Sequence, residues 1–406
     1  MYDKPNPSRL VAAAAQTSSA RKDWRTRLVQ SDCVVPKGFT SLTPAIQRGS
    51  TVVFESLSDA LASKPPGDGY VYGTSGTPTT LELGARIAEL EGARKCFVVP
   101  CGQAAIALTY LAYCGSGSHV LVPESVYRPS RKLGDDLLAG LGIEMELYDP
   151  LIGSGIANLF RQNTSLIWCE SPGSITMEIQ DVPAIAMAAR AAGIKVALDN
   201  TYAAGLFFDA FSSGVEVSVQ ALTKYVGGHS DVLLGTVSVG SSAAAERIAQ
   251  VHDRLGMAAS PDDCALALRG LQTLAIRLAH LEHASMTVAT WLKQQSDVAA
   301  VLHPAFPDCP GHKIWQRDYT GSSSVFSVVF GETWTVERIA RFVDALRLFK
   351  IGFGWGGTTS LVMAYPQMKR RNRNDCHRLV RLNVGLEAVE DLIEDLGQAI
   401  KTSLSR

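Results

Sequence analysis

Short apolar runs alternate with amphipathic segments through the middle of the chain. The intervening segments 102–114, 128–142 and 182–193 carry apolar residues at helical spacing. Short strands that alternate with helices predict βαβ units, and therefore a largely parallel sheet covered by helices. Buried strands are predicted for the apolar runs at 95–101, 119–125, 143–150, 164–171, 194–200 and 217–222.

The two ends of the chain follow other patterns. Residues 1–70 are irregular and rich in proline, glycine, serine and threonine, so this arm must dock on the protein's own body or on a neighbouring subunit. A helix is predicted at 81–92, where Leu83, Ile87 and Leu90 share one face. Beyond residue 258 helices are predicted at 262–295, 336–349 and 388–400, and strands at 322–330 and 378–385. We therefore expect an arm at 1–70, a larger domain at 71–258 and a smaller α+β domain at 259–406.

Composition narrows the class of partner. The 406 residues include 46% apolar and 19% charged residues, and the formal net charge is −1. This balance is typical of a well-buried α/β protein, and it argues against nucleic acid or an anionic membrane surface as the main partner. No apolar run approaches the roughly 18 residues of a membrane span, and the N-terminus has no basic secretory start, so we expect a cytoplasmic protein. The eight cysteines form no Cys-x-x-Cys pair, which favours reduced thiols and no metal site.

Two opposite charges stand at the ends of predicted strands. Asp199 ends one apolar run and Lys224 follows another. A structural ion pair is one interpretation. The other is pyridoxal phosphate (PLP) chemistry, in which a lysine binds the aldehyde as a Schiff base and an acid keeps the pyridine nitrogen protonated. Ligands of parallel sheets bind at the carboxyl ends of strands, and five polar strand ends are expected to meet there. These are Cys101–Gly102, Glu124–Tyr127, Glu170–Gly173, Asp199–Tyr202 and Thr223–Lys224.

Further residues suit the groups that such a site must hold. Gly102 and Gln103 open a predicted helix, whose backbone N–H groups suit a phosphate, and the Thr223 hydroxyl could join them. Tyr127 is placed to stack on a cofactor ring, although an ordinary half-buried tyrosine is equally consistent with its position. Arg381 interrupts an apolar strand and would suit a substrate carboxylate if it points inward. The glycine-rich loop around Trp355 can pass close to a ligand and add backbone donors.

Taken together, these runs resemble the PLP-dependent transsulfuration (Cys/Met metabolism) family. The matching runs span about residues 40 to 400, and ESPGSITMEIQDVPAI is specific for the cystathionine β-lyase branch. They include YGTSGTPTTLEL, PCGQAAIAL, ESVYRPSR, DNTYAAGLFFDAF, ALTKYVGGHSD, FGWGGTTSL and RLVRLNVGLEAVEDL. The resemblance implies a fold-type I PLP-dependent transferase, with a large mostly parallel-sheet cofactor domain and a smaller C-terminal α+β domain. It also implies a homotetramer, as a dimer of dimers with active sites shared across each dimer.

The resemblance assigns roles residue by residue. Lys224 would be the Schiff-base lysine, Asp199 the pyridinium partner and Tyr127 the stacking tyrosine. Gly102, Gln103 and Thr223 would hold the phosphate. Tyr72 would reach into the neighbouring subunit's site. Lys224, Tyr127 and Tyr72 are thus the expected catalytic residues. The expected substrate-binding residues are Arg381, Trp355, Phe353 and Gly354.

Departures from the family pattern leave the reaction open. The Tyr-x-Arg element reads Tyr72-Gly73-Thr74, so the phosphate arginine is missing, and Arg48 is one candidate to replace it. The β-lyase loop Tyr-Ser-Trp-Gly-Gly begins here with Phe353 and Gly354.

The expected activity is α,β-elimination of L-cystathionine or a related amino-acid thioether, giving pyruvate, ammonia and a thiol such as homocysteine. The altered loop keeps γ-elimination or γ-replacement on a homoserine-type amino acid, canavanine included, as the alternative. A third hypothesis is a catalytically inactive protein that acts as an assembly or regulatory partner. The presence of Asp199, Tyr127, Lys224 and Arg381 argues against it.

Overall fold

A seven-stranded sheet forms the larger half of the molecule in the computed structural model, which describes residues 23–29, 41–62 and 69–404. The strand order is β1-β7-β6-β5-β4-β2-β3, and the strands from β6 to β3 run parallel. β7 is antiparallel to both its neighbours. The strands are β1 (Lys95–Val99), β2 (His119–Pro123), β3 (Glu144–Tyr148), β4 (Thr164–Glu170), β5 (Lys195–Asp199), β6 (Val217–Gln220) and β7 (Gly235–Val239).

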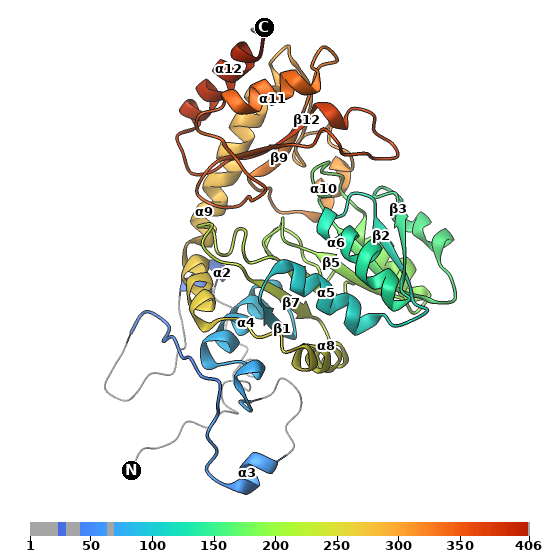
Figure 1. The fold of residues 1–406 in the computed structure, drawn as a ribbon, viewed down its shortest axis with the longest axis vertical. Coiled ribbons are helices and arrows are strands. Elements are labelled where there is room, and N and C mark those ends of the chain that lie inside the picture. The colour runs from blue at the N-terminus through green and yellow to red at the C-terminus, as the bar shows by residue number, and fades with distance from the viewer. Residues whose placement is uncertain (1–22, 30–40, 63–68, 405–406) are drawn as a thin grey trace.

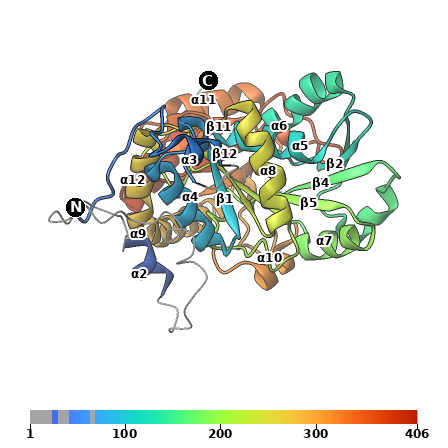
Figure 2. The same ribbon diagram turned by 90° about the horizontal axis from the view of Figure 1, so that it is seen from below.

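Both faces of this sheet are covered, because its strands are apolar on both sides. In β4, Leu166 and Trp168 face the core beneath α5 (Gly102–Tyr113) and α8 (Ser242–Leu255), whereas Ile167 and Cys169 face α7 (Val182–Ala191). Figure 2 shows α5 and α7 on opposite sides of β4 and β5. A third core lies between α4 (Pro78–Glu91) and α9 (Pro261–Lys293) and includes Leu83 and Ile87, as their predicted helical face requires.

The C-terminal part is a second layered unit. Its five-stranded sheet has the order β10-β11-β12-β9-β8, and α9 runs from the larger sheet up to it (Figure 1). Its strands are β8 (Val298–Leu302), β9 (Val325–Phe330), β10 (Lys350–Ile351), β11 (Leu361–Ala364) and β12 (Leu379–Asn383). Its helices are α10 (His312–Asp318), α11 (Val336–Ala345) and α12 (Val389–Leu404). The predicted combination of a mostly parallel sheet with a smaller α+β unit is confirmed.

The segment at 128–142, predicted as one helix, is divided. It begins as α6 (Arg128–Lys132), continues as a π-helical turn (Leu133–Leu138) and ends as a 3₁₀ turn (Ala139–Leu141). Gly134 lies against Met145, and a Cβ at this position would overlap that side chain. Close packing on β3 therefore shapes this segment more strongly than its helical periodicity.

Parts of the N-terminal arm lie outside the described residues. The described parts include α2 (Trp24–Val29), whose Leu28 is buried against α4 and α9, and the exposed helix α3 (Leu57–Leu61). Figure 1 shows α3 projecting away from the body of the protein. Within the described ranges no helix has the length and apolar character that a membrane crossing requires. The seven cysteines described there are all free thiols, and Cys33 lies outside the described residues.

Candidate active site

The carboxyl ends of β4 and β5 bring two acidic residues side by side. Glu170 and Asp199 are direct register partners at the last positions of these strands, and Asp199 also pairs with Val219 of β6. Lys224 follows β6 in the adjacent turn, where its carbonyl oxygen accepts a hydrogen bond from the N–H of Gly228 at 2.8 Å. The predicted convergence of strand ends therefore places Asp199 and Lys224 at one edge of the sheet.

Asp199 is held by its own strand end. Its Oδ1 accepts hydrogen bonds from the Thr201 hydroxyl at 2.5 Å and the Thr201 N–H at 3.0 Å. Burial raises the pKa of Asp199, while the Thr201 hydrogen bonds and the Lys224 charge oppose the rise. Among the described residues none donates a hydrogen bond to Oδ2, so one oxygen is available to a cationic N–H.

Lys224 is a lysine of low basicity. Burial and, to a smaller degree, the positive charge of Arg381 lower its pKa, Asp199 partly opposes them, and the net result is a pKa of about 8. Its Nζ lies 5.4 Å from the centroid of the Trp355 ring. The Trp355 loop packs directly on the lysine backbone: Gly356 has a φ of 79°, and a Cβ there would lie 3.1 Å from the Lys224 carbonyl carbon.

The N-terminus of α5 opens beside this edge. A Cβ on Gly102 would lie 2.7 Å from the Cβ of Ala221, so glycine is needed for the approach of the helix to the Lys224 segment. Cys101 caps the helix by accepting from the Ala104 N–H at 3.4 Å, which leaves the N–H groups of the first turn before Ala104 without an intrahelical acceptor. Such N–H groups bind anions.

The two side chains predicted to assist at the phosphate already have protein partners. Gln103 donates from Nε2 to the Pro129 carbonyl at 3.2 Å, and its buried Oε1 has no partner among the described residues. The Thr223 hydroxyl donates to the carbonyl and accepts from the N–H of Leu234, both at 3.1 Å. Backbone N–H groups are therefore the more accessible donors at this helix end.

Tyr127 lies at the same edge with an open ring. It follows β2, its side chain is 43% exposed, and its N–H donates to Glu170 Oε2 at 2.7 Å. Burial of the hydroxyl raises the pKa of Tyr127, and the charges of Glu170 and Asp199 add to the effect. The hydrogen bond from its backbone fixes the tyrosine relative to the strand ends, while the ring stays available for stacking.

Arg381 points inward from the smaller sheet. β12 lies between β11 and β9, and the Arg381 side chain is buried. Its Nη2 donates to the carbonyls of Phe353 at 2.8 Å, Gly354 at 3.2 Å and Gly352 at 3.4 Å. No carboxylate pairs with it among the described residues. A buried guanidinium held by neutral carbonyls is suited to bind an anion.

The loop residues contribute unequally to this arrangement. Trp355 contacts the site, packing edge-on against Tyr225 with ring centroids 5.3 Å apart. Gly354 contributes its carbonyl to Arg381. Phe353 also contributes its carbonyl, but its side chain is 72% exposed and does not cover Arg381.

The Tyr72 element lies elsewhere in this chain. Tyr72 is half exposed and forms a bridge with Thr51, and Thr74 lines a separate hollow with Lys95 and His252. Arg48 forms an exposed ion pair with Asp262, with 2.7 Å between Nε and Oδ2. Within one chain, neither Thr74 nor Arg48 lies at the α5 N-terminus, and the expected role of Tyr72 requires a second subunit.

Two contributors, Tyr365 and Arg277, were not predicted from the sequence, and a third, Glu170, was expected at the strand ends without a partner or a role. Tyr365 lies under the Arg381 guanidinium, and the distance from the Tyr365 ring centroid to Arg381 Cζ is 5.7 Å. Arg277 of α9 is buried and donates to the carbonyls of Tyr225 at 2.6 Å and Gly270 at 2.8 Å. Its signal in the sequence was a charged residue within the apolar stripe that includes Leu274, Leu278 and Leu281.

These residues fit PLP. Asp199 offers a free carboxylate oxygen, Lys224 is a lysine of lowered pKa, and a helix N-terminus with close glycine packing offers anion-binding N–H groups. The Tyr127 ring and the Arg381 guanidinium reach the same region, since each changes the electrostatic environment of the other. The site thus has positions for the pyridine nitrogen, the phosphate and a substrate carboxylate.

Comparisons with known proteins agree with the predicted family and fold. Residues 25–401 match the model of the family described as Cys/Met metabolism PLP-dependent enzyme. A cystathionine β-lyase from Bordetella avium is 40% identical over 362 residues, covering 87% of this chain and 90% of that protein. The cystathionine β-lyase MetC of Escherichia coli is 38% identical over 388 residues, covering 93% and 98%.

A solved structure supports the same assignment. The crystal structure of metB from Corynebacterium glutamicum superimposes with a TM-score of 0.86 at 25% identity, covering 94% of this chain and 98% of that one. The fold-type I architecture predicted from the sequence is therefore confirmed. The chain belongs to the Cys/Met metabolism family of PLP-dependent enzymes.

Proposed function

We propose that this enzyme cleaves the Cβ–S bond of L-cystathionine or a related amino-acid thioether by α,β-elimination, and that water then hydrolyses the released aminoacrylate, so that the products are pyruvate, ammonia and a thiol. The observation that carries the proposal is that Arg381, from the smaller sheet, faces Lys224 and Asp199 at the edge of the larger sheet, in a chain similar to named cystathionine β-lyases. The same relatives favour cleavage at Cβ over the γ-elimination that the altered Phe353–Gly354 loop had kept open.

Arg381 would orient the substrate. Its guanidinium is buried and already held in place by three carbonyls, so a carboxylate would gain charge-assisted hydrogen bonds without reordering the side chain. Binding the α-carboxylate there directs the amino group and Cα of the substrate toward Lys224. Trp355, which packs over the lysine, would exclude water from the same side.

Lys224 would move the proton at Cα. A general base works best when its pKa lies near the operating pH, and burial together with the Arg381 charge brings the pKa of Lys224 to about 8. PLP, when bound, supplies an electron sink for the negative charge that develops at Cα. Asp199 would hold the ring nitrogen protonated through its free Oδ2. Tyr127 would stack on the ring, and the N–H groups of Gly102 and Gln103 would bind the phosphate.

The arm would complete the site in an assembly. Tyr72, which is half exposed and pairs with Thr51 in its own chain, would reach the site of a neighbouring subunit, and the shared sites would belong to a homotetramer. The exposed arm segment that carries α3 supports an intersubunit role for residues 1–70. Free, partly or fully buried thiols are compatible with action in the cytoplasm.

Product analysis tests the proposal. Full-length protein loaded with PLP is incubated with L-cystathionine, and keto acid and thiol are identified by mass spectrometry. Cleavage at Cβ releases pyruvate with homocysteine, whereas cleavage at Cγ releases 2-oxobutyrate with cysteine. Lys224→Ala should abolish release, and Lys401→Ala, on the outer helix α12, should not. Formation of 2-oxobutyrate would refute the proposal.

A further inference from the structure

A basic loop joins β11 to β12 beside the site. Residues 369–373 carry four cations, of which Arg373 is paired with Asp375, with Nε–Oδ1 and Nη2–Oδ2 distances of 3.0 and 2.9 Å. In the described parts of the chain, Lys369, Arg370 and Arg371 have no acidic ion-pair partner. Three unpaired cations lie together at one place on the surface.

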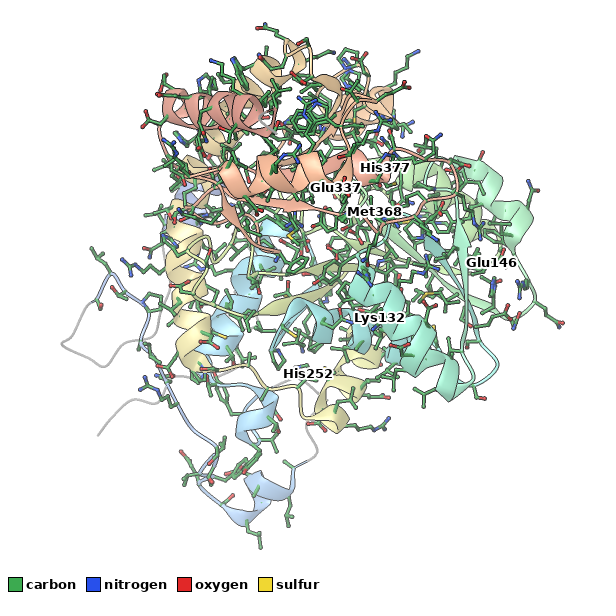
Figure 3. All side chains as sticks on the ribbon, turned by 45° about the horizontal axis from the view of Figure 1, so that its top comes forward. Lys132, Glu146, His252, Glu337, Met368 and His377 are labelled. Carbon is green, nitrogen blue, oxygen red and sulfur yellow. The ribbon has the colours of Figure 1, made fainter. Side chains whose placement is uncertain are left out.

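The loop connects the two halves of the site. At its start, Tyr365 lies under Arg381 and Met368 packs on the same apolar cluster as Trp355. Figure 3 shows Met368 where the C-terminal unit faces the larger domain. At its tip, the N–H of Arg371 donates to Glu124 Oε1 at 2.7 Å, three positions before Tyr127. Asn372 donates from Nδ2 to Asp149 at 3.2 Å. The loop therefore spans from the Arg381 side to the Tyr127 side.

Arg370 is the member of the loop that faces inward. It is partly buried, and its Nε is enclosed without a hydrogen-bond acceptor among the described residues. Its charge favours the ionised form of Glu170, the residue that accepts the Tyr127 N–H. A solvated surface cation would keep its donors in water, so an enclosed Nε without an acceptor, in a loop whose tip is bound to Glu124, indicates a position prepared for an anion.

We propose that Arg370, flanked by Lys369 and Arg371, binds an anionic group on the distal part of the substrate. The enzyme would then select thioethers whose leaving thiol carries a carboxylate. Arg381 would bind the α-carboxylate of the substrate, and the basic loop would bind the carboxylate on the leaving thiol. This inference rests on the proposed function, because it assigns the substrate class of the same site. The Tyr72 element offers only the uncharged Thr74 and Ser75, so this loop is a separate source of positive charge.

A matched pair of substrates tests the inference. S-(2-carboxyethyl)-L-cysteine and its amide, S-(2-carbamoylethyl)-L-cysteine, are nearly isosteric and differ in the charge of the tail. We expect wild-type kcat/KM for the carboxylate to exceed that for the amide by about 10-fold or more. Arg370→Gln should lower the carboxylate value by about 10- to 30-fold and the amide value by less than about 3-fold. Lys401→Gln, which removes one cation from α12, should leave both values unchanged.

Two further variants separate the loss of the Arg370 charge from a loss of folded protein. Arg370→Lys keeps the charge and should retain part of the preference for the carboxylate. Arg371→Gln changes an exposed side chain and should lower the carboxylate value by about 3-fold. Equal visible absorbance of the bound cofactor shows that each variant is loaded. Arg370→Gln and Arg371→Gln variants that keep the wild-type preference would overturn the inference.

Binding measured without turnover separates this inference from the proposed function. The α-methyl derivatives of the two thioethers lack the Cα hydrogen, so their dissociation constants can be measured by calorimetry on the holoenzyme. If pyruvate is released but Arg370→Gln leaves the preference for the charged tail intact in both assays, the loop assignment fails and the β-elimination stands. If no pyruvate is released but Arg370→Gln weakens binding of the charged ligand alone, the loop assignment stands and the β-elimination fails. Equal affinity of the wild-type protein for both ligands would overturn the loop assignment in either case.

Discussion

At the scale of single residues, the site depends on charges that are buried with few partners. Lys224 is surrounded by protein, lies near the cation Arg381, and has one opposing carboxylate, Asp199. Each of these groups would be easier to accommodate in water. Burying Lys224 therefore lowers the stability of the folded protein, and the same burial lowers the pKa of the lysine so that it can act as a base.

The first prediction concerns the stability of the cofactor-free protein. The pKa of Lys224 falls from 10.5 to about 8 on folding, so the folded chain binds this proton less tightly than the unfolded chain does. The stability is therefore complete above about pH 10.5, falls as the pH drops toward 8, and stays reduced below 8. Lys224→Met should raise the free energy of unfolding at pH 7 by up to about 3 kcal/mol.

Urea denaturation over a pH series measures this effect. The difference between Lys224→Met and wild type should shrink between pH 8 and pH 10, because the lysine is then neutral in the folded protein and keeping it neutral costs less as the pH approaches 10.5. Lys401→Met, at an exposed position, provides the matched control. A difference that stays constant across this range would show that Lys224 is not destabilised in the folded protein.

The second prediction concerns Arg381. Arg381→Ala should lower kcat/KM for the thioether by about 30-fold or more, since truncating a buried charge partner costs roughly 2–5 kcal/mol. The cofactor spectrum should remain, because no phosphate contact is lost. Arg381→Lys should recover little, because an ammonium cannot form the bidentate contact. Loss of cofactor with an unchanged KM would assign Arg381 a structural role.

At the scale of elements, one helix holds the lysine in place. Arg277 of α9 donates to carbonyls that follow Lys224, and Gly228 lies so close to it that any Cβ would overlap the guanidinium. Burial lowers the pKa of Arg277 to about 10. The buried Arg277 guanidinium thus supplies hydrogen-bond donors to backbone carbonyls of the turn that carries Lys224.

The third prediction tests this clamp. Arg277→Met should lower the free energy of unfolding by about 2 kcal/mol, because the carbonyls of Tyr225 and Gly270 lose their donor. It should also lower the fraction of protein that retains PLP on dialysis. Arg269→Met changes an exposed arginine on the same helix and serves as the control. Equal cofactor retention in both variants would mean that Arg277 does not position Lys224.

The elements also show where sequence patterns were sufficient. Strands buried on both faces, such as β4, were predicted because their apolar runs are continuous. β7 was not predicted, because Thr236 and Ser238 alternate with valines that face the α5 core. Those two polar residues lie near the buried carboxyl of Glu91, which accepts a hydrogen bond from Ser218 at 2.6 Å. An internal polar cluster gives a buried strand the pattern of a half-exposed one.

The candidate site was predictable to a similar degree. Asp199, Lys224 and Tyr127 follow strands, so the topology rule brings them together. The contact of Tyr365 with Arg381 and the hydrogen bond from the Arg371 N–H to Glu124 depend on how one long loop folds back across two domains. No local periodicity encodes such a path.

At the scale of the whole molecule, one chain holds most of the site but not all of its expected residues. Tyr72, which directly follows the arm, pairs with Thr51 and not with Lys224, and α3 projects from the body (Figure 1). The fourth prediction follows: a mixture of Lys224→Ala and Tyr72→Ala chains, refolded together, should regain about a quarter of wild-type activity. Random pairing in a symmetric dimer leaves one intact site in each mixed pair. A mixture that stays as inactive as its components would place Tyr72 in the site of its own chain, and a Tyr72→Ala protein that is active by itself would place Tyr72 outside any site.

The most direct test of the central claim, that the site is built around Lys224, is to locate the bound cofactor on the chain. Borohydride treatment of the holoenzyme fixes PLP on the lysine that binds its aldehyde, and peptide mass spectrometry then identifies that lysine. We predict that the modification lies on the peptide containing Ala221 to Gly228, at Lys224, and that no other peptide carries it. Modification of a different lysine, or a protein that binds PLP without any modified peptide, would contradict the account.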